Sequence, residues 1–190
     1  MRRTQAERRE TTRTALLHAA RGLFAERGVA DTSRDDVAER AGVTRGALYH
    51  HFPSKNAVAV AVIGALDDEL SARVVAAAAR GSDAFDRLRR AARAYIDACA
   101  EPDVARLLLE APLVLTPDEL RAMNEATCLR LLEPALSAGL DLPGDLAVTA
   151  RLLLGMLDEA ARLVATDPRS KRRVNATVDA VLERVIPAVS

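Results

Sequence analysis

The chain has 190 residues, which is enough for one large domain or two small ones with a buried core. Apolar residues make up 49% and aromatic residues only 3%, while Ala, Leu, Arg and Glu dominate, so the composition predicts helix throughout. The net charge is zero, but residues 1–55 carry 11 Lys/Arg against 7 Asp/Glu, which leaves 16 against 20 for residues 56–190. The excess of basic residues in the segment 1–55 favours DNA binding by that segment.

Residues 4–27 predict the first helix, which Gly28 ends. Its apolar stripe would pack across the next two helices and consists of Leu16, Leu17, Ala20, Leu23 and Phe24. Residues 1–3 are either a frayed end or a basic arm that touches DNA. No apolar run of a signal peptide follows MRRTQAERRE, and no stretch reaches the ~18 apolar residues of a membrane span. We therefore expect a cytoplasmic protein with no membrane partner.

Residues 32–55, TSRDDVAERAGVTRGALYHHFPSK, predict two short helices joined by a tight turn, with another helix starting at the end. The apolar positions of the two helices, at helical spacing, are Val37, Ala38, Ala41, Leu48 and Phe52. Gly42 lies where the chain reverses, a position that favours positive φ. Thr32 or Ser33 can cap the first helix, and Thr44 the second. This pattern is typical of a helix-turn-helix, whose second helix enters the DNA major groove.

The exposed residues around the second short helix suit DNA contact. Arg45 can fork onto a guanine edge, and the small Gly46 allows close approach. Lys55 lies in the first turn of the next helix, where free amides and the helix dipole favour a phosphate. The predicted DNA-binding residues are Ser33, Arg34, Thr44, Arg45, Gly46, Ala47, Tyr49, His50 and Lys55. Any short amphipathic helix pair can show such a pattern, so a purely structural role stays open on this ground alone.

The stretch AGVTRGALYHHFPSK closely resembles the signature of the TetR family of bacterial transcriptional regulators, an AGVSxGxxYxHFxxK-like sequence that ends the DNA-binding domain. The matching residues are Val37, Ala38, Ala41, Gly42, Val43, Gly46, Tyr49, His51, Phe52 and Lys55. The resemblance covers residues 4–60, and beyond them only length and helical character agree. Arg34 departs from the family, whose members often have an apolar residue there; an arginine at this position can point at the DNA.

The resemblance implies an all-α protein of about nine helices with two domains. Residues 1–55 would form the three-helix helix-turn-helix domain, and residues 56–190 a helical domain for effector binding and dimerisation. The remaining helices are predicted at about 54–79, 83–100, 104–114, 117–137, 145–166 and 169–187. The first half of the helix at 54–79 is apolar on nearly every side, which predicts burial between the domains and a role for this helix as a lever. Its run Asp67-Asp68-Glu69 is expected to be a solvated face.

The helix at 145–166 has an apolar surface wider than a single stripe, so it needs partners on two sides. A second copy is one such partner, and we expect a homodimer through the helices at 145–166 and 169–187, as the resemblance also implies. Candidate residues of an effector pocket, for which core packing is the alternative, are Tyr95, Cys99, Leu108, Met123, Cys128 and Met156. Aliphatic walls predict a small apolar or amphipathic effector. Glu110, Asp158 and Glu159 could meet a cationic ligand, with surface or dimer-edge positions as the alternative.

An enzyme is not expected. The sequence has no HExxH, no GxSxG, no phosphate-cradling glycine loop and no pair of CxxC motifs. Adjacent residues of a helix diverge by ~100°, so His50 and His51 do not readily share a metal. Cys99 and Cys128 lack metal-ligand spacing, which favours ordinary buried thiols over a disulfide or redox switch. We expect neither a cofactor nor a metal.

The predicted function is that of a homodimeric repressor on double-stranded operator DNA, released by a small-molecule effector. Two alternatives stay open. One is a DNA-binding regulator without a small-molecule effector, and the other is a helical enzyme or interaction module in which the helix-turn-helix is incidental.

Overall fold

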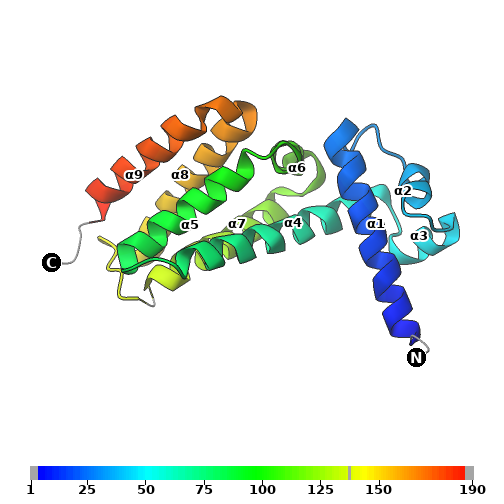
Figure 1. Cartoon of the computed structure of the whole chain (residues 1–190), viewed down its shortest axis with the longest axis horizontal. Coiled ribbons are helices and arrows are strands. Elements are labelled where there is room, and N and C mark those ends of the chain that lie inside the picture. Colours follow the sequence, from blue (N-terminus) through cyan, green and yellow to red (C-terminus); the bar gives the residue numbers. More distant parts are fainter. Residues whose placement is uncertain (1–3, 137, 187–190) are drawn as a thin grey trace.

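The computed structural model describes residues 4–136 and 138–186, and for residues 124, 127–131 and 134 it describes only the backbone. Over these ranges the chain is all-α, as predicted, and the helices follow one another without a strand (Figure 1). The elements are α1 (Gln5–Arg27), α2 (Arg34–Arg40), α3 (Arg45–His51), α4 (Lys55–Ala78), α5 (Ala84–Cys99), α6 (Pro102–Val114), α7 (Pro117–Leu136), α8 (Leu146–Thr166), the 3₁₀ turn η1 (Pro168–Ser170) and α9 (Lys171–Val185).

Helices α1 to α3 form a head at one end of the molecule, with α1 lying across α2 and α3 (Figure 1). Thr4 begins α1 with a capping box, and Gly28 ends it at φ +87°. The predicted stripe is buried at Leu16, Ala20, Leu23 and Phe24, while Leu17 is only half-buried. This apolar face holds the two short helices, neither of which is long enough to be stable alone.

Local capping sets the helix-turn-helix as the sequence predicts. The Ser33 hydroxyl accepts a hydrogen bond from the Asp36 amide and caps α2, and the Thr44 hydroxyl accepts one from the Ala47 amide and caps α3. Gly42 adopts φ +66° in the turn between them. Thr32 does not cap α2; its buried hydroxyl donates to the Gly28 carbonyl at 2.7 Å.

Helix α4 belongs to both ends of the molecule (Figure 1). Its first half, including Val58, Val62 and Leu66, joins the apolar cluster of the head, while Val74 and Ala78 join that of the C-terminal helices. The second cluster lies among α4, α5, α7, α8 and α9. No helix in the described part of the chain combines the length and the apolar character needed to cross a membrane.

Two helix starts differ from the sequence prediction by two residues. Helix α6 starts two residues early, at Pro102, because proline lacks an N–H and fits the first helical position. The last helix starts late, at Lys171, because Pro168 begins a separate 3₁₀ turn that the Ser170 hydroxyl closes on the Asp167 carbonyl. Helix α7 ends at Leu136, and residue 137 lies outside the described residues.

Candidate functional site

Helix α3 presents its polar side chains to solvent because two apolar ones anchor it. Leu48 and Phe52 are buried in the head, which turns Arg45, Tyr49 and His50 outward. The side chain of Arg45 is 71% exposed. The exposed residues thus form one face of the head, as a helix that enters a DNA groove requires.

Asp35, in the first turn of α2, contacts two side chains of this face. Its Oδ1 lies 3.1 Å from Arg45 Nε and 3.4 Å from the Tyr49 hydroxyl. An exposed ion pair of this kind contributes little stability, so its effect is mainly to fix where the Arg45 guanidinium points before DNA arrives. Sequence reasoning missed Asp35 because its partners lie ten and fourteen residues away, on another helix.

Arg34 and Lys55 are both engaged within the head. The Arg34 guanidinium lies 4.1 Å above the centre of the Tyr49 ring and donates to the Pro53 carbonyl at 2.9 Å. The Arg34 side chain therefore lies against the C-terminal half of α3. Lys55 Nζ donates to the Ala30 carbonyl at 2.8 Å, so it would exchange that acceptor for a phosphate on binding DNA.

His51 faces inward from the end of α3 and differs in this from the exposed His50. Burial, and after it the nearby charge of Arg9, lowers the pKa of His51. The lowered pKa favours the neutral imidazole, which packs beside Phe52. The Phe52 ring also lies under the Arg13 guanidinium at 4.9 Å.

A cavity of about 190 Å³ lies among α4, α5, α6, α7 and α8. It is walled by Ile63, Leu66, Asp67, Leu70, Tyr95, Val104, Leu107, Leu108, Leu109, Ala111, Pro112, Leu120, Met123, Asp158 and Arg162. Three of the predicted pocket residues, Tyr95, Leu108 and Met123, are among these. Met156 lines a separate hollow between α8 and α9, and the Cys128 side chain lies outside the described residues.

Cys99, the remaining predicted pocket residue, is fully buried. Burial raises the pKa of the Cys99 thiol to about 12, so almost no thiolate exists at neutral pH. We expect a Cys128→Ser variant to show no reaction with Ellman's reagent at pH 8 until it is unfolded in guanidinium chloride. Rapid release of one equivalent of thionitrobenzoate from the native protein would contradict this burial.

The acidic residues Asp67, Glu110, Asp158 and Glu159 lie in different surroundings in the structure. Asp67 and Asp158 are half-buried and line the cavity, so the predicted solvated face holds for the exposed Asp68 and Glu69 but not for Asp67. The apolar first half of α4 shows too little periodicity to reveal this. Glu159 points outward and binds the Arg162 guanidinium at 2.9 Å, and Glu110 points away from the cavity toward α1.

Helix α6 joins the cavity to the head. The Val29 N–H, just after α1, donates to the Glu110 carboxylate at 2.7 Å, and Arg106 holds that carboxylate from the preceding turn at 3.2 Å. Arg21 of α1 pairs with Asp103 at 2.8 Å. Val104 and Leu107 belong to the apolar cluster of the head and at the same time line the cavity.

The outer face of α8 and α9 is apolar and exposed. Large apolar residues exposed there include Val148, Leu152, Leu163, Val181 and Val185, and Leu152 is 70% exposed. Beside them the hollow between the two helices, about 470 Å³, is lined by Met156, Leu163 and Val174 among others. An exposed apolar patch of this extent is typical of a protein interface.

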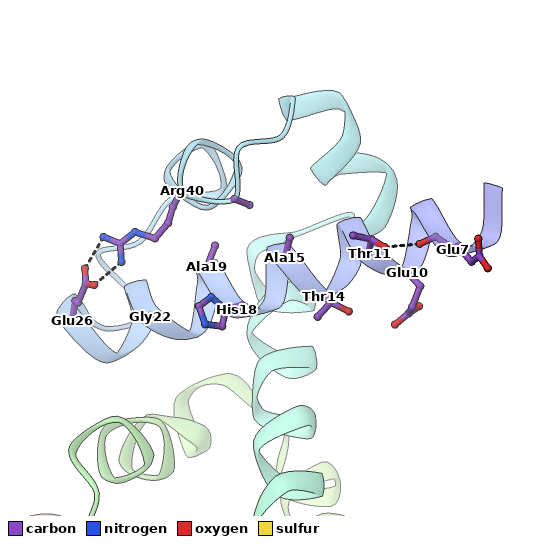
Figure 2. Close-up of a pocket in the computed structure, with 11 residues that line it drawn as sticks. Glu7, Glu10, Thr11, Thr14, Ala15, His18, Ala19, Gly22, Glu26 and Arg40 are labelled. Carbon is purple, nitrogen blue, oxygen red and sulfur yellow. Dashed lines mark hydrogen bonds and ion pairs between the residues drawn. The ribbon is translucent and has the colours of Figure 1, made fainter. Parts of the chain in front are cut away.

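An open groove of about 1350 Å³ runs along the outer face of α1 (Figure 2). Ala15, Ala19 and Gly22 form its floor, and the Arg40–Glu26 ion pair closes one end. Glu7 and Glu10 lie toward the other end (Figure 2). These carboxylates disfavour a phosphate backbone in the groove.

Comparison with known families decides what this arrangement is. Residues 16–62 match the model of the bacterial regulatory proteins of the tetR family, and residues 85–188, more than half of the chain, match the tetracyclin repressor-like C-terminal domain. The chain belongs to the TetR family. The resemblance seen in the sequence is therefore confirmed, and this TetR-family chain is a DNA-binding transcriptional regulator rather than an enzyme.

Individual TetR-family proteins agree with this assignment. A TetR-family transcriptional regulator of Pectobacterium atrosepticum of known structure is 34% identical, with 99% of this chain and 100% of that chain covered and a TM-score of 0.79. The regulator TtgR of Pseudomonas putida is 46% identical over 68 residues, and the activator FasR of Mycolicibacterium smegmatis is 34% identical over 120. These matches cover 36% and 63% of this chain but only 32% and 55% of the two relatives.

Replacing Arg45 tests the DNA face of this TetR-family head. If the guanidinium forks onto a guanine, Arg45→Ala should cost about 1–3 kcal/mol of operator binding and relax specificity at that base pair. The measurement is the affinity for the operator and for single base-pair variants of it. Arg40→Ala is the control, because Arg40 lies outside α3 and is paired with Glu26. Unchanged affinity and specificity in Arg45→Ala would remove Arg45 from the base contacts.

Proposed function

We propose that this TetR-family regulator is a homodimeric repressor, acting in the cytoplasm, that leaves its operator when a small molecule enters the cavity. Residues 1–55 would bind the operator, through the nine predicted contacts from Ser33 to Lys55, and residues 56–190 would bind the effector and the second copy. Two α3 helices would occupy successive major grooves of a roughly palindromic site, about one helical turn apart.

The shared wall of the cavity carries this proposal. Val104 and Leu107 touch the cavity on one side and pack with the buried core of the head on the other. The same helix holds α1 through Asp103 and Glu110. An effector that displaces α6 would therefore move the head without any long chain of intermediate contacts.

Release requires that the effector prefer one arrangement of the heads. Occupation of the cavity would shift α6 and, with it, α4, which borders the same cavity at Ile63, Leu66 and Leu70. Helix α4 begins at the head and α6 packs against α1, so the two α3 helices would no longer match the spacing of the DNA grooves. Structures with and without a bound effector that show equal spacing of the α3 helices would contradict this mechanism.

The exposed face of α8 and α9 supports the dimer. The hollow between the helices, lined by Met156, Leu163 and Val174, would receive side chains of the matching helices of a second copy. Burial of apolar surface stabilises by about 25 cal/mol per Å², so leaving this face in water is costly for a monomer.

In vitro transcription distinguishes a repressor from an activator. The relatives include both, since BepR of Brucella suis is named a repressor and FasR an activator. With a template that carries the region upstream of the chain's own gene, we expect added protein to reduce the transcript, because a dimer on the promoter blocks polymerase. A template with a scrambled operator is the control. An increase in transcript would overturn the repressor proposal.

A further inference from the structure

We propose that the effector is a small amphipathic cation, a protonated amine on an apolar body, whose ammonium group binds between Asp67 and Asp158. This inference rests on the proposed function, because it specifies the ligand of the same cavity. It goes beyond the apolar or amphipathic effector that the aliphatic walls predict.

Among the side chains that the structure describes, the cavity has one polar pole, made of Asp67, Tyr95 and Asp158, and is otherwise apolar apart from Arg162 at its rim. Asp67 comes from α4, Tyr95 from α5 and Asp158 from α8, so three helices each bring one oxygen-bearing side chain to it. Tyr95 lies close enough to Asp158 for its hydroxyl to act on the pKa of the Asp158 carboxyl, which it lowers. Apart from Arg162, the other described lining residues are Leu, Ile, Val, Ala, Met and Pro, mostly of α6. An ammonium donates up to three hydrogen bonds and accepts none, which suits a pole of carboxylates.

Arg162 also borders the cavity but is held at its rim. Its side chain is 61% exposed, and its Nη2 lies 2.9 Å from Glu159 on the outer surface of α8. The guanidinium is thus bound by an outward-facing carboxylate. The polar pole therefore selects against an anionic ligand, which would meet two carboxylates before it met Arg162.

The energetics of Asp158 favour a cationic ligand over a neutral one. Burial raises the pKa of the Asp158 carboxyl even though the charge of Arg162 and the hydrogen bond from Tyr95 both act to lower it. Its surroundings therefore do not fully offset the cost of removing the carboxylate from water. A bound ammonium would recover that cost, whereas a neutral group of the same size would not.

The test uses three probes of nearly equal size that fit a cavity of about 190 Å³. They are cyclohexylmethylamine, cyclohexylmethanol and cyclohexanecarboxylate, titrated by calorimetry into the full chain at pH 7.5. We expect the amine to bind at least tenfold more tightly than the alcohol, and the carboxylate not to bind. A tenfold change corresponds to about 1.4 kcal/mol.

Substitutions show where the amine binds and distinguish the effect of carboxylate charge from that of cavity shape. Asp158→Asn keeps the size of the side chain, so it should weaken amine binding at least tenfold and leave the alcohol within about twofold; Asp67→Asn should act in the same direction. Asp68→Asn, the same charge change at an exposed neighbour on α4, should have no effect. Leu108→Trp should fill the cavity and prevent amine binding.

Several results would overturn the cationic class. These are alcohol or carboxylate binding that equals that of the amine, no probe binding at all, or amine binding that is unaffected by Asp158→Asn and Asp67→Asn. The anisotropy of labelled operator DNA, measured with each probe, tests the proposed function separately. If the carboxylate probe binds in the cavity and releases DNA, the ligand is not a cation, but the proposal that a ligand releases the operator holds. If the amine binds there and DNA stays bound, the cationic ligand is supported, but the proposal that it releases the operator fails.

Discussion

Leu152→Asp should convert the dimer into a monomer and weaken operator binding by roughly 100-fold or more. This residue is 70% exposed on α8 in the single chain, so the substitution should leave the fold of the monomer intact. In the proposed interface it would bury a carboxylate against apolar side chains, at a cost of several kcal/mol. Operator binding would then fall because a single head loses the second half-site, which the dimer presents at high effective concentration.

Leu113→Asp is a matched control for this variant. Leu113 is the most exposed of the large apolar residues that the structure describes, at 85%, but it lies on α6 and is not part of the exposed apolar face of α8 and α9. Sedimentation velocity should show a monomer for Leu152→Asp and a dimer for Leu113→Asp and the unchanged chain. A dimer in Leu152→Asp with full operator affinity would contradict an interface through α8 and α9.

Gly28→Ala should be the most destabilising single substitution at the junction between the head and α6. Gly28 adopts φ +87° and ψ +166°, which is accessible almost only to glycine. A Cβ there would also lie 2.7 Å from Glu110 Oε1 and 2.9 Å from an Arg106 nitrogen. These flexible side chains can move, but Glu110 would then lose its hydrogen bond to the Val29 amide. Strain and the lost bond together predict about 2–4 kcal/mol of lost unfolding free energy.

Gly42→Ala separates backbone strain from the junction contact. Gly42 also has a positive φ, +66°, but nothing lies within 4 Å of an added Cβ. Its cost should be limited to roughly 1–2 kcal/mol of strain. Urea denaturation of the three proteins at pH 7.5 gives the comparison. Equal free energies of unfolding for Gly28→Ala and Gly42→Ala would show that the Glu110 contact contributes nothing.

The local parts of the head were predictable because short-range chemistry determines them. Ser33 and Thr44 cap their helices through amides three residues away, and Gly42 meets the need for positive φ in the turn. Each of these effects depends on a few neighbouring residues, so the sequence alone indicates them. The anchoring of α3 by Leu48 and Phe52 follows in the same way from helical spacing.

The junction and the polar pole of the cavity could not be predicted in this way. The Glu110–Val29 bond joins residues 81 positions apart, and no periodicity relates them. Asp67 looked solvated because it begins a run of three acids, and α4 has too little amphipathic contrast to show which side faces α6. The Arg45–Asp35 pair likewise depends on the angle between two helices. Such contacts are set by tertiary packing, which a pattern on one helix does not contain.

Fluorescence anisotropy with labelled DNA from upstream of the chain's own gene tests sequence-specific operator binding most directly. Scrambled DNA of equal length is the control, and both are titrated at two salt concentrations because phosphate contacts weaken with salt. We predict tight binding to the upstream fragment alone, with two chains bound per operator. An absence of binding to either DNA, even at low salt, would contradict operator binding by the helix-turn-helix head.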